Sequence, residues 1–173
     1  MQAVEKDVAT LFAATKVLVV DDEPFMRKVI RTLLLSIGIR SAYEAADGLA
    51  GLEAIRNLAP DVVILDWEMP MLDGPAFVRL VRSPETFPIP NIPIIMLTGH
   101  GERSRVVEAV RLGVNEFLLK PVSTKALKDR MVSVLMSPRP LVQSGSYYGP
   151  APRKLSSYKP EADQQIANIV MVN

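Results

Sequence analysis

Several residues with acidic, hydroxyl or amine side chains stand directly after unbroken runs of apolar residues. They are Asp21, Asp22, Asp66, Thr98 and Lys120, and the runs are at residues 17–20, 62–65, 94–97 and 117–119. Apolar runs of this length, without polar alternation, are typical of strands buried on both faces of a parallel sheet. These side chains are therefore predicted at the carboxyl ends of strands, where ligands bind in open α/β sheets.

Their types indicate phosphoryl chemistry. Carboxylates gathered at one edge repel one another, and each binds a proton more readily unless a cation balances them. Magnesium is a hard ion that takes oxygen ligands and pairs with phosphate, so Mg²⁺ fits such a setting. An aspartate can attack phosphorus and form an acyl phosphate. Asp66 could accept a phosphoryl group with only Mg²⁺, Lys120 and the Thr98 hydroxyl to assist, because an ionised carboxylate needs no general base.

Each of these residues also has a purely structural interpretation. Asp22 could cap a helix, and Asp66 could open a turn. Thr98 could simply end a strand, and Lys120 could be a solvated charge before Pro121. Turn chemistry does not explain why all of them fall at strand ends, so we favour a shared site.

Strand and helix patterns alternate along the central part of the chain. A weaker strand is predicted at 39–45, and helices are predicted at 24–38, 47–60, 77–81, 104–112 and 123–136. Five strand–helix alternations in sequence predict βαβ units stacked into one parallel sheet with helices on both faces. The fold class is therefore a doubly wound α/β sheet.

The pattern divides the chain into three parts. Residues 1–14 are an N-terminal extension, predicted as a short amphipathic helix that lies against the domain or a partner, with docking on the domain favoured. Residues 15–136 are the α/β domain. Residues 137–173 are a tail that contains Pro, Ser and Tyr and lacks a strand or helix period until its end. A loosely packed or disordered tail is one expectation, and a contribution to partner binding is another.

Composition excludes several classes of protein. The 173 residues include no cysteine, which rules out disulfides and thiolate metal sites, and the net charge of +1 does not suggest nucleic-acid binding. No apolar run is long enough for a membrane span, and no basic segment precedes an apolar one at the N-terminus. We expect a soluble, cytoplasmic protein that contacts neither membrane nor nucleic acid directly.

Four blocks of sequence resemble the receiver domain of two-component response regulators. They are VVDDEP at 19–24, LDWEMPMLDG at 65–74, LTG at 97–99 and LKP at 119–121. The resemblance covers roughly residues 15 to 136, with every block in order. It implies a flavodoxin-like fold with strand order 2-1-3-4-5.

The resemblance also implies a role for each acidic residue of the site. Asp66 would accept a phosphoryl group from a sensor histidine kinase or a histidine phosphotransfer protein. Asp22, Asp66 and the backbone carbonyl of Glu68 would bind Mg²⁺, and Asp21 would act through a coordinated water. Glu68 and His100 would modulate how fast the phosphoryl group is lost.

A switch is implied as well. Thr98 and Lys120 would bind the phosphoryl oxygens, Phe117 would rotate inward, and the bond before Pro121 would be cis. The surface expected to respond is formed by the helix at 104–112, the strand at 117–119 and the helix at 123–136. The residues of this surface that we single out are Val106, Val107, Val110 and Ala126.

The preferred function is a stand-alone, CheY-like response regulator that is not an enzyme and acts on an unknown downstream protein, as a monomer or weak dimer. The segment at 147–154 resembles an extension of alphaproteobacterial stand-alone receivers. One alternative is a pseudo-receiver scaffold that works without phosphorylation. Another is an aspartyl-phosphate phosphatase, since Asp66-Trp67-Glu68 loosely resembles a D-x-D nucleophile pair, although that family carries its nucleophile on an early strand.

Overall fold

The computed structural model describes residues 2–99 and 103–152, without the side chains of Gln2 and Arg103. The helices are α1 (Gln2–Ala14), α2 (Pro24–Ser36), α3 (Gly48–Leu58), α4 (Gly74–Val81), α5 (Arg103–Leu112) and α6 (Thr124–Met136). The strands are β1 (Lys16–Val20), β2 (Ser41–Ala45), β3 (Val62–Asp66), β4 (Ile94–Thr98), β5 (Glu116–Leu119), β6 (Leu141–Ser144) and β7 (Tyr147–Pro150). None of the helices in these ranges is long and apolar enough to cross a membrane.

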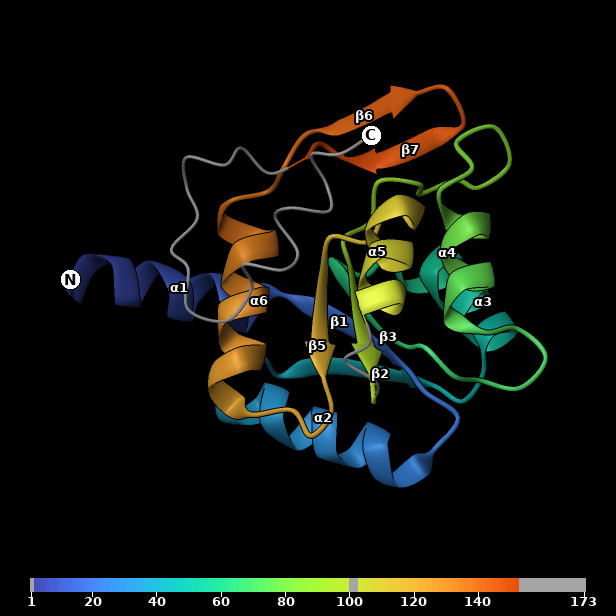
Figure 1. The fold of residues 1–173 in the computed structure, drawn as a ribbon. Coiled ribbons are helices and arrows are strands. Elements are labelled where there is room, and N and C mark those ends of the chain that lie inside the picture. The colour runs from blue at the N-terminus through green and yellow to red at the C-terminus, as the bar shows by residue number, and fades with distance from the viewer. Residues whose placement is uncertain (1, 100–102, 153–173) are drawn as a thin grey trace.

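The first five strands form one parallel sheet in the order β2-β1-β3-β4-β5 (Figure 1). Both the parallel sheet and this strand order are as predicted. β1 and β3 lie in the middle, and each pairs on both sides along most of its length. All five strands run in the same direction, so their carboxyl ends meet at one edge.

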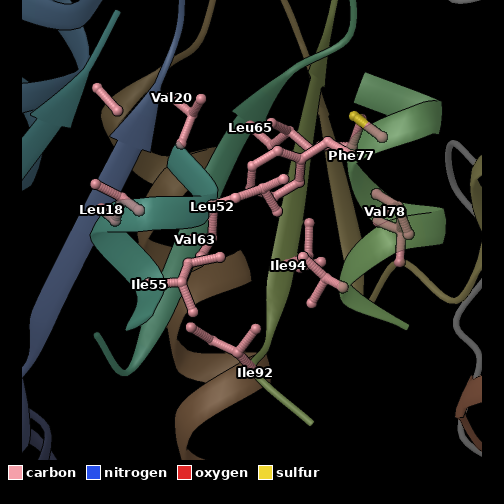
Figure 2. Packing of buried hydrophobic residues seen from close by; sticks show 14 of the residues in the cluster. Leu18, Val20, Leu52, Ile55, Val63, Leu65, Phe77, Val78, Ile92 and Ile94 are labelled. Atoms are coloured by element: carbon pink, nitrogen blue, oxygen red, sulfur yellow. The ribbon is translucent and has the colours of Figure 1, made fainter. Parts of the chain in front are cut away.

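Helices cover both faces of the sheet, which explains why β1, β3 and β4 carry apolar runs without alternation. Leu18 and Val20 of β1 face α3, α4 and α5, in a cluster centred on Phe77 (Figure 2). Val17 and Val19, their neighbours in sequence, face α2 and α6 on the other side. Successive side chains of a strand point to opposite faces, so a strand covered on both faces is apolar at every position.

The N-terminal helix α1 docks by its last turns. Phe12 is fully buried among residues of α2 and α6, and Val8 is partly buried beside them. Val4, one turn further out, is 60% exposed. The predicted amphipathic helix is thus present, and it contacts its own domain.

The tail is where the sequence-based description was wrong within the described residues. Residues 141–150 form an antiparallel hairpin, β6–β7, where we expected neither a strand pattern nor firm packing. The hairpin lies above α5 in Figure 1, and the backbones meet where a Cβ built on Gly149 would be only 2.7 Å from Gly113 Cα. Residues 153–173, with the predicted helical spacing near the C-terminus, lie outside the described part.

Two arginines bind the segments at the amino ends of β4 and β5, and one of them, Arg139, lies just before the hairpin. Arg82 donates hydrogen bonds to the carbonyls of Gly113 and Ile92 and to the Asn115 side chain, at 2.8–2.9 Å. Arg139 donates to the Asn115 carbonyl at 2.6 Å. Burial lowers the pKa of Arg82 to about 10. These contacts lie at the amino ends of β4 and β5, the edge opposite the polar residues at the strands' carboxyl ends.

Candidate functional site

Four of the predicted site residues line one cleft at the carboxyl ends of the strands. The cleft has a volume of about 630 Å³ and is open to solvent. Its lining includes Asp22, Asp66, Glu68 and Lys120 of the predicted set, and it adds Glu23, Trp67, Met69, Pro70, Asp73, Gly99 and Arg105. His100 lies outside the described residues.

Asp66 and Lys120 are the centre of the cleft. The Lys120 ammonium donates a hydrogen bond to Asp66 Oδ1 at 2.8 Å. The same nitrogen lies 3.7 Å from Asp21 Oδ2, so one cation serves two carboxylates. The Lys120–Pro121 peptide bond is cis, as the resemblance implies.

The negative charge of Asp21 and Asp66 is only partly balanced by Lys120. Burial is the main reason that the pKa of Asp66 rises to about 6, and the charge of Asp21 adds to the effect of burial. Burial also raises the pKa of Asp21. For Lys120, burial alone would lower the pKa, but the hydrogen bond and charge of Asp66 outweigh it and raise the pKa. Folding therefore holds two carboxylates where a further cation would be favourable.

The donor atoms suit a small divalent cation. Oxygens of Asp21, Asp22 and Asp66 all lie within 4.8 Å of one another. Asp21 Oδ1 accepts from the Glu23 backbone N–H at 2.9 Å, whereas the buried Asp21 Oδ2 has no hydrogen-bond partner. Three carboxylates with one buried oxygen left unbonded are a donor set that fits Mg²⁺.

Asp22 does not cap a helix, which was the purely structural interpretation of this residue. Helix α2 begins after Glu23, which makes no capping hydrogen bond through its side chain. Asp22 is partly exposed and lines the cleft. Other helices of the protein do have side-chain caps. Asp47 and Asp73 accept hydrogen bonds from backbone N–H groups at the starts of α3 and α4.

The loop after β3 passes very close to the acidic residue at its start. The backbone N–H of Gly74 bonds to the Trp67 carbonyl at 2.8 Å. A Cβ on Gly74 would lie 2.7 Å from the Asp66 carbonyl oxygen, which no side chain tolerates. Glycine at position 74 therefore lets the loop close against Asp66, and Asp73 beside it starts the next helix.

Thr98 and Phe117 lie beside this cleft. Thr98 is buried and Phe117 is partly buried, and both line a small hollow with Met96, Trp67 and Arg105. Trp67 and Arg105 border both the hollow and the cleft, so Asp66 and Phe117 have these two neighbours between them.

Sequence reasoning missed Arg105 and underrated Trp67. Trp67 is only 8% exposed, and no motif in the sequence marked it as part of the site. Arg105 lies in the first turns of α5 and crosses to the loop after β3, where it pairs with Glu68 at 2.8 Å. An arginine on a polar helix carries no motif, so only the packing of α5 identifies it.

Comparison with known proteins gives a family match over most of the chain. Residues 17–132 match the family described as the response regulator receiver domain. The chain is 38% identical over 121 residues to chemotaxis protein CheY1 of Helicobacter pylori, covering 69% of this chain and 96% of that protein. It is 33% identical over 116 residues to chemotaxis protein CheY-3 of Vibrio cholerae, covering 67% of this chain and 88% of that protein.

Solved structures agree with the fold. Vibrio cholerae CheY4 matches with a TM-score of 0.62 and 31% identity, over 70% of this chain and 98% of that chain. A putative response regulator from Chloroflexus aurantiacus matches with a TM-score of 0.65 and 29% identity, over 70% of this chain and 98% of that chain. In both cases the likeness spans nearly the whole of the other chain.

Proposed function

The chain belongs to the response regulator receiver family, and from this premise we propose that it is a switch whose phosphoryl acceptor is Asp66. CheY-like receivers are signalling switches rather than enzymes that turn over a substrate, and in general they interact with histidine kinases and downstream targets. The observation that carries the proposal is the 2.8 Å bond between Lys120 and Asp66 inside an acidic cleft. It places a nucleophile beside a cation that can bind phosphoryl oxygens.

Mg²⁺ fits the site and completes it in this proposal. Asp22, Asp66 and the Glu68 backbone carbonyl would bind the ion, and Asp21 would act through a coordinated water. When bound, Mg²⁺ neutralises charge on the carboxylates and on the transferred phosphoryl group. The unbonded Asp21 Oδ2 supports this assignment.

The protein's own groups account for the rest of the chemistry. A carboxylate oxygen of Asp66 attacks the phosphorus of the donor, and the donor's leaving group departs with the electron pair. Lys120 donates a hydrogen bond to Asp66 before the transfer. Afterwards it would donate to the phosphoryl oxygens instead. Thr98, at the end of β4, would donate its hydroxyl to the phosphoryl group, and Phe117 would move toward the hollow behind Thr98.

The signal would leave through the face formed by α5, β5 and α6. Phosphorylation adds charge at the carboxyl edge of the sheet and biases the positions of Thr98 and Phe117. Val106, which lines the hollow with them, belongs to α5. Val107, Val110 and Ala126 complete the surface that we expect a downstream protein to read. The donor would be a sensor histidine kinase or a histidine phosphotransfer protein.

The first test is the mass of the intact protein after incubation with acetyl phosphate and Mg²⁺. We expect one phosphoryl adduct that is absent in Asp66→Asn and absent when EDTA removes the metal. Trp67 fluorescence in the same samples reports the state of the cleft, since Trp67 lines it. If the folded wild-type protein forms no adduct under any condition, the pseudo-receiver scaffold replaces this proposal.

A further inference from the structure

The lining of the cleft carries more negative than positive side chains. The acidic lining residues are Asp22, Glu23, Asp66, Glu68 and Asp73, and the basic ones are Lys120 and Arg105. Lys120 already pairs with Asp66 and Asp21. Phosphoryl donors are anions, so an uncompensated carboxylate at the entrance would oppose their approach.

Glu68 is an exposed carboxylate of the cleft that pairs with a residue of another element. Its side chain is 63% exposed, two residues beyond Asp66, and its Oε1 lies 2.8 Å from Arg105 Nη2. Arg105 itself is only 25% exposed, since its guanidinium lies over the Trp67 ring, 5.4 Å from the centroid. The ring and the carboxylate together hold this arginine in the wall of the cleft, which a flexible exposed pair would not achieve.

We propose that Arg105 is a positioning residue for phosphoryl transfer, because it neutralises Glu68 at the entrance and so lets an anionic donor reach Asp66. This inference rests on the proposed function of Asp66. With acetyl phosphate as donor, the bond from Asp66 oxygen to phosphorus forms, the bond from phosphorus to the acetyl oxygen breaks, and acetate leaves with the electron pair. No proton is gained or lost in this step, so the effect of Arg105 is on the approach and placement of the donor.

Arg105 also connects the entrance to the output face. It belongs to α5, whereas Glu68 and Trp67 belong to the loop after β3. The charge at the entrance therefore depends on where α5 lies. A partner that shifts the start of α5 would change how readily the donor is accepted.

The experiment measures the rate constant of adduct formation with acetyl phosphate and saturating Mg²⁺ at low ionic strength. Arg105→Gln is expected to slow the reaction about five-fold, the effect of removing one positive charge near the donor. Glu68→Gln combined with Arg105→Gln removes both charges and is expected to restore the rate to within about two-fold. Arg105→Lys keeps the charge and should rescue most of the rate. The deficit of Arg105→Gln should shrink in high salt, which screens exposed charges.

The matched control is Arg79→Gln. Arg79 and Glu108 form another ion pair between α4 and α5, at 3.7 Å, and neither residue lines the cleft. This variant loses the same charge and should keep the wild-type rate. Equal slowing in Arg79→Gln, an unchanged rate in Arg105→Gln, or no recovery in the double variant would each overturn the role of Arg105. A wild-type protein without any adduct would overturn the proposed function together with this inference.

Discussion

Asp66 combines two properties that conflict in a folded protein. It is 5% exposed, yet its proposed chemistry requires a charged carboxylate. The Lys120 hydrogen bond lowers the pKa of Asp66 but does not offset burial and the charge of Asp21. The site therefore stores unfavourable electrostatic energy in the metal-free protein, and a cation beside the carboxylates relieves it.

A pH dependence of stability follows for the metal-free protein. The pKa of Asp66 is about 6 in the folded state, above its ordinary value of 3.8. The folded state thus binds the proton more tightly, and stability falls as pH rises from about 4 through 6. Asp66→Asn removes this dependence, so its advantage over wild type should grow to about 1–3 kcal/mol at pH 7.5. Urea unfolding of both proteins in EDTA at pH 5 and pH 7.5 measures the difference, and parallel behaviour of the two would contradict it.

At the level of single residues, the sequence predicted what lies at strand ends and missed what crosses between elements. The sequence predicted the positions of Asp21, Asp66, Thr98 and Lys120, because each comes directly after a run of apolar residues and the end of such a run is visible in the sequence. Arg105 was missed because its importance comes from Glu68 and Trp67, which are distant in sequence and near only after folding. His100 stays a prediction: we expect His100→Ala to change the lifetime of the phosphorylated state without preventing its formation.

Among the elements, the hairpin β6–β7 and the end of α5 are joined by backbone contact. Gly113 follows α5 with φ of +93°, and a Cβ there would lie 2.6 Å from the Tyr148 carbonyl oxygen. Only glycine permits both the positive φ and this close approach. The glycine that ends α5 is also the place where the hairpin sits.

Gly113→Ala should therefore destabilise the protein more than a positive φ alone explains. Left-handed strain costs about 1–2 kcal/mol, and the clash with the hairpin adds about 1–3 kcal/mol. Gly38→Ala is the matched control, because Gly38 has φ of +100° but nothing within 4 Å of a Cβ. Urea unfolding of the two variants separates strain from clash, and equal losses would show that the hairpin contact is unimportant.

The sequence predicted the elements of the sheet well, because buried strands and amphipathic helices are local patterns. It did not predict the hairpin. β6 and β7 have four residues each and include Gly149 and Pro150, so their composition is that of a loop. The hairpin is held by contacts with segments that are distant in sequence and carry no local pattern: Arg139, just before β6, bonds the Asn115 carbonyl, and Gly113 lies against Tyr148 and Gly149.

For the molecule as a whole, the hairpin is part of the folded unit. It is attached to the amino ends of β4 and β5, and the proposed phosphorylation site is at the carboxyl ends. The two regions are thus separated by the full length of the sheet. Stability and phosphoryl acceptance should respond differently to changes at the hairpin.

A chain that ends at residue 136 tests this separation. Loss of the hydrogen bond between Arg139 and Asn115, together with the rest of the hairpin, should lower the free energy of unfolding by at least about 1.5–3 kcal/mol. A chain that ends at residue 152 keeps the hairpin and serves as the control. Both should form the Asp66 adduct at 20 °C if folded. Gly113→Ala in the shorter chain should cost no more than Gly38→Ala, since the clashing carbonyl is gone.

The attachment of α5 has a mechanical consequence. Its carboxyl end is held by Gly113 against Gly149, whereas Arg105 near its amino end meets the cleft through Glu68 and Trp67. If phosphorylation displaces α5, the helix would pivot about this fixed end, so its displacement would be largest beside the proposed phosphoryl acceptor and smallest at the hairpin. A partner that binds the amino-terminal turns of α5 would therefore contact the part of the helix that moves most. A partner that binds its last turn would contact a part that moves very little.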